Sequence, residues 1–267
     1  MLNELFEQDR WLRIAGSKLT KSPYYNDHVY KKTAIFLEEY VKFYGLSVDQ
    51  VLKMYNDFTG EYSRHIREFL KTGKYPYQNS LTVDLDRIDY DIVLILSVLI
   101  SVHRHRIFCN LFNAIQKLKG NSLVIGVGSG LELDYLNGKP ENVTAYDLSI
   151  SKHVFQKFNR INIKEEYFTG AKNAYRSIFA IELLEHLADP LEFIRMVYDS
   201  LEIDGLFHFT TATNIPQIDH LYNFDDESGF EKELHSIGFQ IVEKEIIFHE
   251  SIDSKLIASN TWYILKK

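Results

Sequence analysis

The feature that most constrains the fold is a short apolar run that leads directly into a glycine-rich turn. Leu123–Val127 has the aliphatic and β-branched character of a buried strand, and it continues into the sequence GVGSG at 126–130. Glycine tolerates positive φ and lets a backbone approach a ligand closely. The spacing GxGxG differs from the GxGxxG pattern that binds pyrophosphate. The run therefore predicts a strand, a turn and a helix around a ligand without phosphates.

The chain changes its hydrophobic pattern at Gly120. Before it, apolar residues recur at helical spacing, in a pattern that ends at Gly45, in one that begins at Ser47, and in one over Tyr90–Lys119. After it, short strand-like runs alternate with helical patterns, which is typical of βαβ units and a mostly parallel sheet. The expected strands are Ser122–Val127, Val143–Asp147, Ser177–Ile181, Gly205–Thr211, Phe239–Phe248 and Thr261–Leu265; the expected helices are Ser149–Asn159, Leu183–Leu201 and Gly229–Ile237.

These patterns predict two parts of the chain. Residues 1–117 form an all-helical region, and residues 118–267 form an α/β domain with a Rossmann-like fold. The helical region carries more apolar faces than it can satisfy alone, so we expect it to pack over the carboxyl edge of the sheet as a lid on the substrate.

Charge and composition exclude several classes of protein. The net charge of the 267 residues is −7, which argues against a nucleic-acid partner because phosphate binding needs a basic face. The single cysteine, Cys109, permits no intrachain disulfide and fits a reducing compartment. The most apolar stretch, Ile92–Val102, is too short to span a membrane, and the acidic N-terminus does not resemble a signal peptide. We expect a cytoplasmic protein; its oligomeric state stays open.

An acidic residue ends the second expected strand. Asp147 follows Gly130 by 17 positions. A carboxylate at this point of a Rossmann-like fold accepts hydrogen bonds from ribose hydroxyls. The alternative is a helix cap, because Ser149 and Ser151 follow. Its position after the GxGxG turn favours ribose binding.

These features together resemble the class I S-adenosylmethionine-dependent methyltransferases. The resemblance rests on VIGVGSG, AYDLS, IFAIELLEHLADPLEFI, LEIDGLFHFTT and HSIGFQIVEKE, which occur in the family's order over about residues 120–267. It implies a seven-stranded sheet whose last strand is antiparallel. It also implies methyl transfer and a set of cofactor contacts: Gly126, Val127, Gly128, Gly130, Asp147, Leu148 and Glu182.

One departure from the family concerns the adenine pocket. Many members carry an acid after the third strand, whereas the stretch matched to it here, Phe168 to Ala171, has none. Backbone or hydroxyl contacts from Thr169, Gly170 and Ala171 are expected to replace it.

A Glu-x-x-Glu-His segment follows the fourth expected strand. Glu182, Glu185 and His186 reach the carboxyl edge of the sheet, where ligands bind in open α/β folds. His220 lies in a loop after the next strand and returns to that edge. The arrangement resembles small-RNA terminal 2′-O-methyltransferases and the metal-dependent O-methyltransferases of the ubiquinone pathway. It predicts a divalent metal, Fe, Mn, Zn or Mg, held by these four residues.

A metal-free interpretation of the same residues remains open. Glu-His-Leu before Asp-Pro is widespread in methyltransferases that use no metal. In that case His186 or His220 is the candidate general base, because imidazole titrates near neutral pH.

The helical region offers candidate substrate contacts. His103 and Arg106 are three residues apart on one helical face, and Tyr24 and Tyr25 belong to an aromatic cluster with Tyr30. They either contact the substrate or have structural roles, as a solvated helix face and as packed core.

The sequence therefore predicts S-adenosylmethionine-dependent methyl transfer to a small molecule, with oxygen favoured as the acceptor if a metal is present. Two alternatives stay open: a nicotinamide-dependent oxidoreductase, and a non-catalytic protein that binds S-adenosylmethionine as a regulatory or scaffold subunit.

Overall fold

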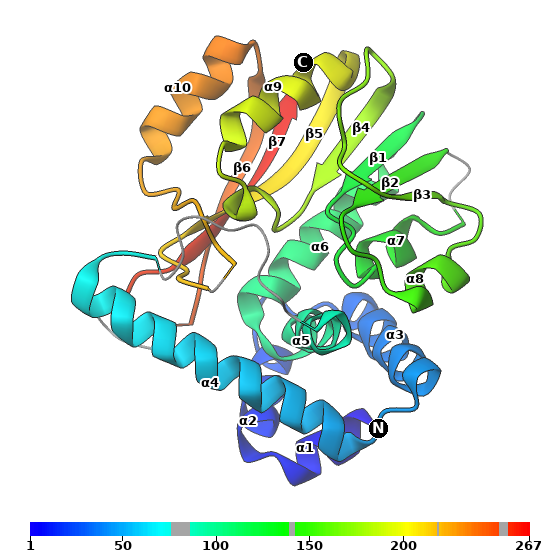
Figure 1. Cartoon of the computed structure of the whole chain (residues 1–267), viewed down its shortest axis with the longest axis vertical. Coiled ribbons are helices and arrows are strands. Elements are labelled where there is room, and N and C mark those ends of the chain that lie inside the picture. The colour runs from blue at the N-terminus through cyan, green and yellow to red at the C-terminus, as the bar shows by residue number, and fades with distance from the viewer. Residues whose placement is uncertain (76–85, 139–141, 218, 251–255) are drawn as a thin grey trace.

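The computed structural model describes residues 1–75, 86–138, 142–217, 219–250 and 256–267. A seven-stranded sheet at one end of the molecule packs against a group of N-terminal helices at the other (Figure 1). The strand order is β3-β2-β1-β4-β5-β7-β6, and β7 is antiparallel to both of its neighbours. This arrangement confirms the predicted Rossmann-like sheet with an antiparallel last strand.

Six of the seven strands overlap the runs predicted from sequence. The exception is β3, four residues at the sheet edge with no fully buried side chain, so the apolar pattern that reveals a strand is missing. The strands are β1 (Ser122–Ile125), β2 (Val143–Asp147), β3 (Asn162–Glu165), β4 (Tyr175–Ala180), β5 (Leu201–Thr213), β6 (Gln240–Phe248) and β7 (Ser259–Lys266).

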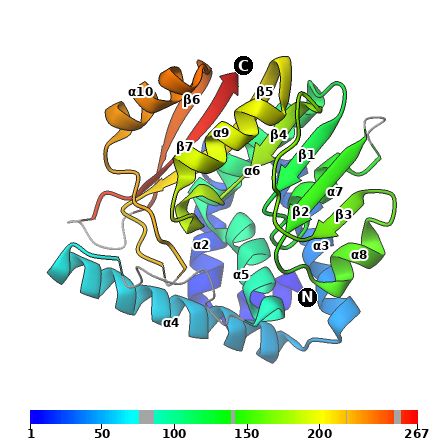
Figure 2. The same cartoon turned by 45° about the horizontal axis from the view of Figure 1, so that its top comes forward.

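Helices cover both faces of the sheet, and alternate strand residues separate the two cores. On β1, Val124 packs toward α6 and α7, whereas Leu123 and Ile125 pack toward α9 and α10 on the other face. Figure 2 shows α9 and α10 together on one side of the sheet. These helices are α7 (Leu131–Leu136), α8 (Lys152–Lys157), α9 (Pro190–Ser200) and α10 (Glu227–Ile237), with a 3-10 turn η1 at Leu184–His186.

Helix ends in the N-terminal region follow local sequence signals. Ser47 caps α4 in a reciprocal pair with Gln50, and Gly45 ends α3 in the left-handed conformation at φ 65°. The long pattern predicted over 90–119 is two helices that meet at Ser101 with an 89° bend. The helices are α1 (Leu2–Gln8), α2 (Arg10–Thr20), α3 (Asp27–Tyr44), α4 (Val48–Thr72), α5 (Arg87–Ile100) and α6 (Val102–Gln116).

The N-terminal helices share a hydrophobic core with one face of the sheet. Leu12, Leu37 and Ile95 from the helices belong to the same buried cluster as Val124 and Trp262 from the strands. The change of pattern near residue 117 is therefore a change of secondary structure inside a continuous core.

Among the described helices, none is by itself long and apolar enough to cross a membrane. Only α5 and α6 taken together reach that length, across their bend.

Candidate active site

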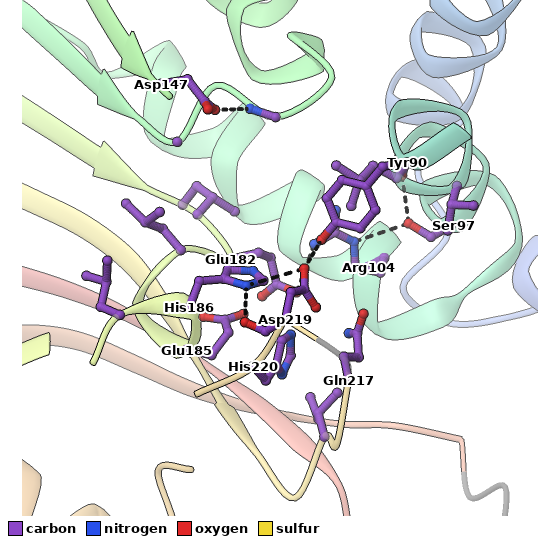
Figure 3. Close-up of a pocket in the computed structure, with 18 of the residues that line it drawn as sticks. Tyr90, Ser97, Arg104, Asp147, Glu182, Glu185, His186, Gln217, Asp219 and His220 are labelled. Atoms are coloured by element: carbon purple, nitrogen blue, oxygen red, sulfur yellow. Dashed lines mark hydrogen bonds and ion pairs between the residues drawn. The ribbon is translucent and has the colours of Figure 1, made fainter. Parts of the chain in front are cut away.

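A cavity of about 1470 Å³ lies where the carboxyl ends of β1, β2, β4 and β5 meet helices α4 and α5. Single small-molecule sites usually occupy roughly 300–1,000 Å³, so this cavity has room for two ligands side by side. One end is lined by the glycine turn and Asp147. The other end is lined by Glu185, His186 and His220, with Tyr90 of α5 close to them (Figure 3).

The three glycines of the turn have positive φ but different surroundings. Gly126 and Gly128, at φ 78° and 53°, line the cavity. Gly130, at φ 82°, packs against α8, where an added Cβ would lie 2.6 Å from Cγ2 of Val154. Val127 is fully buried in the core. The turn thus presents two glycines to a ligand and uses the third for helix packing.

Asp147 lines the cavity at the end of β2, with Leu148 beside it. Its two carboxylate oxygens accept hydrogen bonds from the backbone N–H groups of Gly128 and Ser149, each at 3.0 Å (Figure 3 shows the bond to Gly128). The cap-like bond to Ser149 and a ribose role are compatible, because a carboxylate has about four acceptor positions. The backbone bonds hold the carboxylate in a defined position beside the turn.

The segment after β3 differs from the sequence prediction. Glu166, Tyr167 and Phe168 line the cavity, whereas Thr169, Gly170 and Ala171 do not. The backbone N–H of Ala171 donates to Oγ of Ser200 at 2.9 Å. The reason is that β3 ends at Glu165, three residues before the stretch to which the family motif was matched. An acid therefore does follow the third strand, and it is Glu166.

Glu182 is placed differently from its predicted role as a metal ligand. One carboxylate oxygen pairs with Nη1 of Arg104 at 2.8 Å. The other accepts hydrogen bonds from the Thr210 hydroxyl and the Asn260 amide, each at 2.8 Å. Its backbone has a positive φ of 53°, unusual for glutamate, and its N–H also donates to Thr210. These partners satisfy the hydrogen-bonding capacity of the Glu182 carboxylate.

The remaining three predicted metal ligands do come together. Glu185, His186 and His220 each offer an atom within 4.8 Å of the others. Glu185 is only 1% exposed, and within the described ranges neither of its carboxylate oxygens has a hydrogen-bond partner. Nδ1 of His220 is likewise buried without one. Buried polar atoms are normally paired, so this cluster has the character of an incomplete ligand shell.

The pKa values of Glu185, His186 and His220 are shifted in different directions by their surroundings. Burial, reinforced by the carboxylate of Glu182, raises the pKa of Glu185 to about 8. Burial and the neighbouring His186 lower the pKa of His220 to about 4, so this imidazole is neutral at physiological pH. Burial alone would lower the pKa of His186, but Asp219 and Glu185 outweigh it and raise the pKa.

Asp219 and Tyr90 complete the cluster, and the sequence did not reveal them. Nδ1 of His186 lies 3.0 Å from the backbone oxygen of Asp219 and 3.4 Å from its carboxylate. The hydroxyl of Tyr90, on α5, donates to that carboxylate at 2.9 Å (Figure 3). When Nδ1 donates to Asp219, the neutral imidazole of His186 keeps its lone pair on Nε2.

Of the predicted substrate contacts, only His103 lines the cavity. His103 stacks on His249 with ring centroids 3.5 Å apart. Arg106 pairs with Glu245 of β6 at 2.9 Å and lies over the Tyr24 ring, while Tyr25 stacks on His105. His103 and Arg106 do share a helical face, but that face follows β6, and only its first turn reaches the cavity. Arg106, Tyr24 and Tyr25 therefore have packing roles.

Aromatic side chains from the helical region line the cavity instead. Tyr55, Phe58 and Tyr62 on α4 and Tyr90 on α5 face the cavity. In the sequence they belong to ordinary apolar stripes, so no local signal distinguishes them from core residues.

Comparison with known families identifies a match over residues 103–244, to the family described as "Methyltransferase domain". No curated protein sequence matches the chain.

Solved structures of similar fold have low sequence identity. A candidate sarcosine dimethylglycine methyltransferase of Galdieria sulphuraria superimposes with a TM-score of 0.50 at 10% identity, covering 61% of this chain and 86% of that one. The N-methyltransferase NodS of Bradyrhizobium japonicum, in complex with S-adenosylhomocysteine, gives 0.49 at 17% identity, with 61% and 86% covered. A methyltransferase of Archaeoglobus fulgidus gives 0.48 at 14%, with 60% and 92% covered.

Proposed function

The chain belongs to the class I S-adenosylmethionine-dependent methyltransferases, and we propose that it methylates an oxygen atom of a small-molecule acceptor with the help of a divalent metal. Family membership removes the nicotinamide-dependent alternative and favours an enzyme over a non-catalytic binding protein. The acceptor, the metal and the roles of individual residues are parts of the proposal.

The cofactor end of the cavity fits S-adenosylmethionine. Gly128 leaves open space beside the turn, because an added Cβ there would meet no atom closer than 3.6 Å, whereas a Cβ on Gly126 would lie 3.1 Å from Cδ1 of Leu183. Asp147 is the residue that would hold the ribose hydroxyls, and Glu166 and Phe168 are placed to hold adenine. When bound, the cofactor supplies an electrophilic methyl group on a sulfonium, so the protein's main task is to align an acceptor with it.

The cluster of Glu185, His186 and His220 carries the proposal of an oxygen acceptor. A hydroxyl must lose its proton as its oxygen forms the new bond to carbon, while the electron pair of the old carbon–sulfur bond stays on sulfur. Nε2 of His186 is free to take that proton because Nδ1 is engaged by Asp219. An acceptor hydroxyl beside this imidazole would be activated directly.

The same cluster fits a divalent cation. Two imidazoles and one carboxylate suit iron, manganese or zinc better than magnesium, which prefers oxygen ligands and water. The unpartnered oxygens of Glu185 and the unpartnered Nδ1 of His220 are the atoms that a cation would satisfy. A bound cation would lower the pKa of the acceptor hydroxyl. Glu182 is left out of this ligand set because Arg104, Thr210 and Asn260 already hold it.

A metal-free version of the proposal rests on a separate observation. The Tyr90 hydroxyl contacts the Asp219 carboxylate, and this carboxylate in turn lies beside the His186 imidazole. A carboxylate that orients an imidazole in this way is the usual arrangement of a general base. In that version Glu185, whose pKa is raised by burial, packs beside the base.

We further propose that α4 and α5 cover the acceptor. Both helices line the cavity, and the hydroxyls of Tyr90 and Tyr75 tie the helical region to the loop after β5 that carries His220. Closure of this kind excludes water from the methyl transfer.

The experiment combines elemental analysis with product analysis. Protein purified without a histidine tag should contain about one metal per chain, and Glu185→Gln and His220→Ala should lose it. Glu192→Gln, an exposed carboxylate at the cavity rim, is the matched control and should keep it.

Incubation with panels of hydroxylated compounds, amines and thiols should give methylated oxygen, detected by mass spectrometry. Full activity of a metal-free protein in chelator would leave the base-only version. Methylation of amines alone would contradict the oxygen acceptor.

A further inference from the structure

A second buried carboxylate in the cavity has no role in the proposed chemistry. Glu132 lies in the first turn of α7, two residues after Gly130. Glu132 is 7% exposed and lines the cavity. Its Oε2 has no hydrogen-bond partner among the described residues. A buried carboxylate oxygen without a donor is costly, so its place in the fold needs an explanation.

The other carboxylates deep in the cavity have partners or belong to the histidine cluster. Asp147 is held by two backbone N–H groups, and Glu182 by Arg104, Thr210 and Asn260. Glu185 belongs to the candidate metal site. Glu132 is thus the carboxylate at the glycine-turn end whose demand for a hydrogen-bond donor the fold leaves unmet.

The electrostatic surroundings indicate which ligand group would meet that demand. Burial raises the pKa of Glu132 to about 7, and Asp91 and Asp147 add to the effect, while a hydrogen bond to its own backbone and the charge of Arg104 oppose it. Arg104 is already paired with Glu182. A ligand that places a cation with N–H donors beside Oε2 would therefore stabilise the carboxylate form.

We propose that Glu132 binds the α-ammonium group of the cofactor's amino-acid end. S-adenosylmethionine and its demethylated product both carry this ammonium, which offers three N–H donors. Glu132 directly follows the turn whose Gly126 and Gly128 line the same cavity, so a cofactor bound at that turn would have its amino-acid end within reach of this carboxylate. The assignment depends on the cofactor and is independent of the acceptor and of the metal.

The test compares three ligands by isothermal titration calorimetry, without turnover. S-adenosylhomocysteine carries the ammonium, its deaminated analogue retains the carboxylate but lacks the ammonium, and methylthioadenosine lacks both. The parent protein should prefer S-adenosylhomocysteine to the deaminated analogue by about tenfold or more, the size expected of a hydrogen bond between charged groups. Glu132→Gln should reduce this preference to near unity while binding methylthioadenosine as the parent does.

Glu192→Gln serves as the control because it removes one negative charge from the exposed rim of the same cavity. It should retain the full preference for the ammonium. The proposal is overturned if Glu132→Gln keeps that preference. It is also overturned if Glu132→Gln weakens all three ligands equally, which would make Glu132 a structural residue. Loss of the preference in the control as well would show that bulk charge is responsible.

Discussion

The sheet region and the helical region build the cavity in different ways. The sheet region, residues 122–267, supplies groups at the ends of strands, such as Asp147 after β2 and Glu185 and His186 after β4. The helical region, residues 1–116, supplies side chains from within long helices, such as Tyr62 on α4 and Tyr90 on α5. Polar residues that follow a strand lie at a predictable edge of the sheet. On a helix face, the same apolar and aromatic residue types either pack in the core or contact a ligand.

The helical region lines the cavity and shares the core with the sheet. It shares a buried cluster with the sheet, and it contributes both Arg104, which holds Glu182, and Tyr90, which holds Asp219. We therefore expect substitutions in the sheet region to affect catalysis and cofactor binding directly, and substitutions in the helical region to act through the positions of His186 and Asp219.

The largest expected effect is on catalysis through the sheet region. His186→Ala removes the candidate base and metal ligand, so kcat should fall by about 10²–10⁴-fold. The Kd for S-adenosylhomocysteine should stay unchanged, because His186 lies at the acceptor end. Parallel measurements of turnover and calorimetric binding test this, and an active His186→Ala variant would remove the histidine from the chemistry.

A smaller effect is expected on cofactor binding. Asp147→Asn should weaken S-adenosylhomocysteine binding by about 1.5–3 kcal/mol, roughly ten- to a hundredfold in Kd. At saturating cofactor, kcat should change much less, because the variant leaves the acceptor end intact. Unchanged affinity would show that Asp147 only orders the turn through Gly128 and Ser149.

The pH dependence of the free energy of unfolding allows one buried histidine from each region to be compared. His208 on β5 is 4% exposed, and burial lowers its pKa to about 3. The unfolded chain takes up a proton at this residue below about pH 6.5 and the folded chain does not, so stability falls as pH falls. The His208 contribution should fall by about 2 kcal/mol between pH 7 and pH 5.

Urea unfolding of His208→Phe over that range should show a correspondingly flatter dependence. His105 on α6 is buried too, but its ring nitrogens bond to Val98 and Asn26. His105→Phe should therefore destabilise the fold at every pH by leaving those backbone groups unpaired. An equal pH dependence in His208→Phe and the parent would refute the assignment.

The smallest effect is expected from the helical region. Tyr90→Phe removes the hydroxyl that binds Asp219 but keeps the ring, so kcat should fall by roughly tenfold or less with little loss of stability. Tyr30→Phe, outside the cavity, is the control and should leave kcat unchanged. A Tyr90→Phe variant with parental kcat would show that α5 covers the site without positioning His186.

The sequence by itself determined what lies within short contiguous segments. The glycine turn, Asp147 and the Glu-x-x-Glu-His segment were visible because strand, turn and helix signals depend on neighbouring residues. The mostly parallel sheet followed from the alternation of strands and helices, apart from β3, whose exposed edge position hides its pattern, and the antiparallel last strand followed from the family resemblance.

Only the tertiary structure decided which side chains meet. Arg104 pairs with Glu182, Asp219 lies beside His186, and Arg106 pairs with Glu245 of β6. The pairs Arg104–Glu182 and Arg106–Glu245, and likewise Tyr90–Asp219, join residues that lie 78 to 139 positions apart in the chain. Such distances in sequence leave no local pattern, because what brings the partners together is the packing of the helices against the sheet.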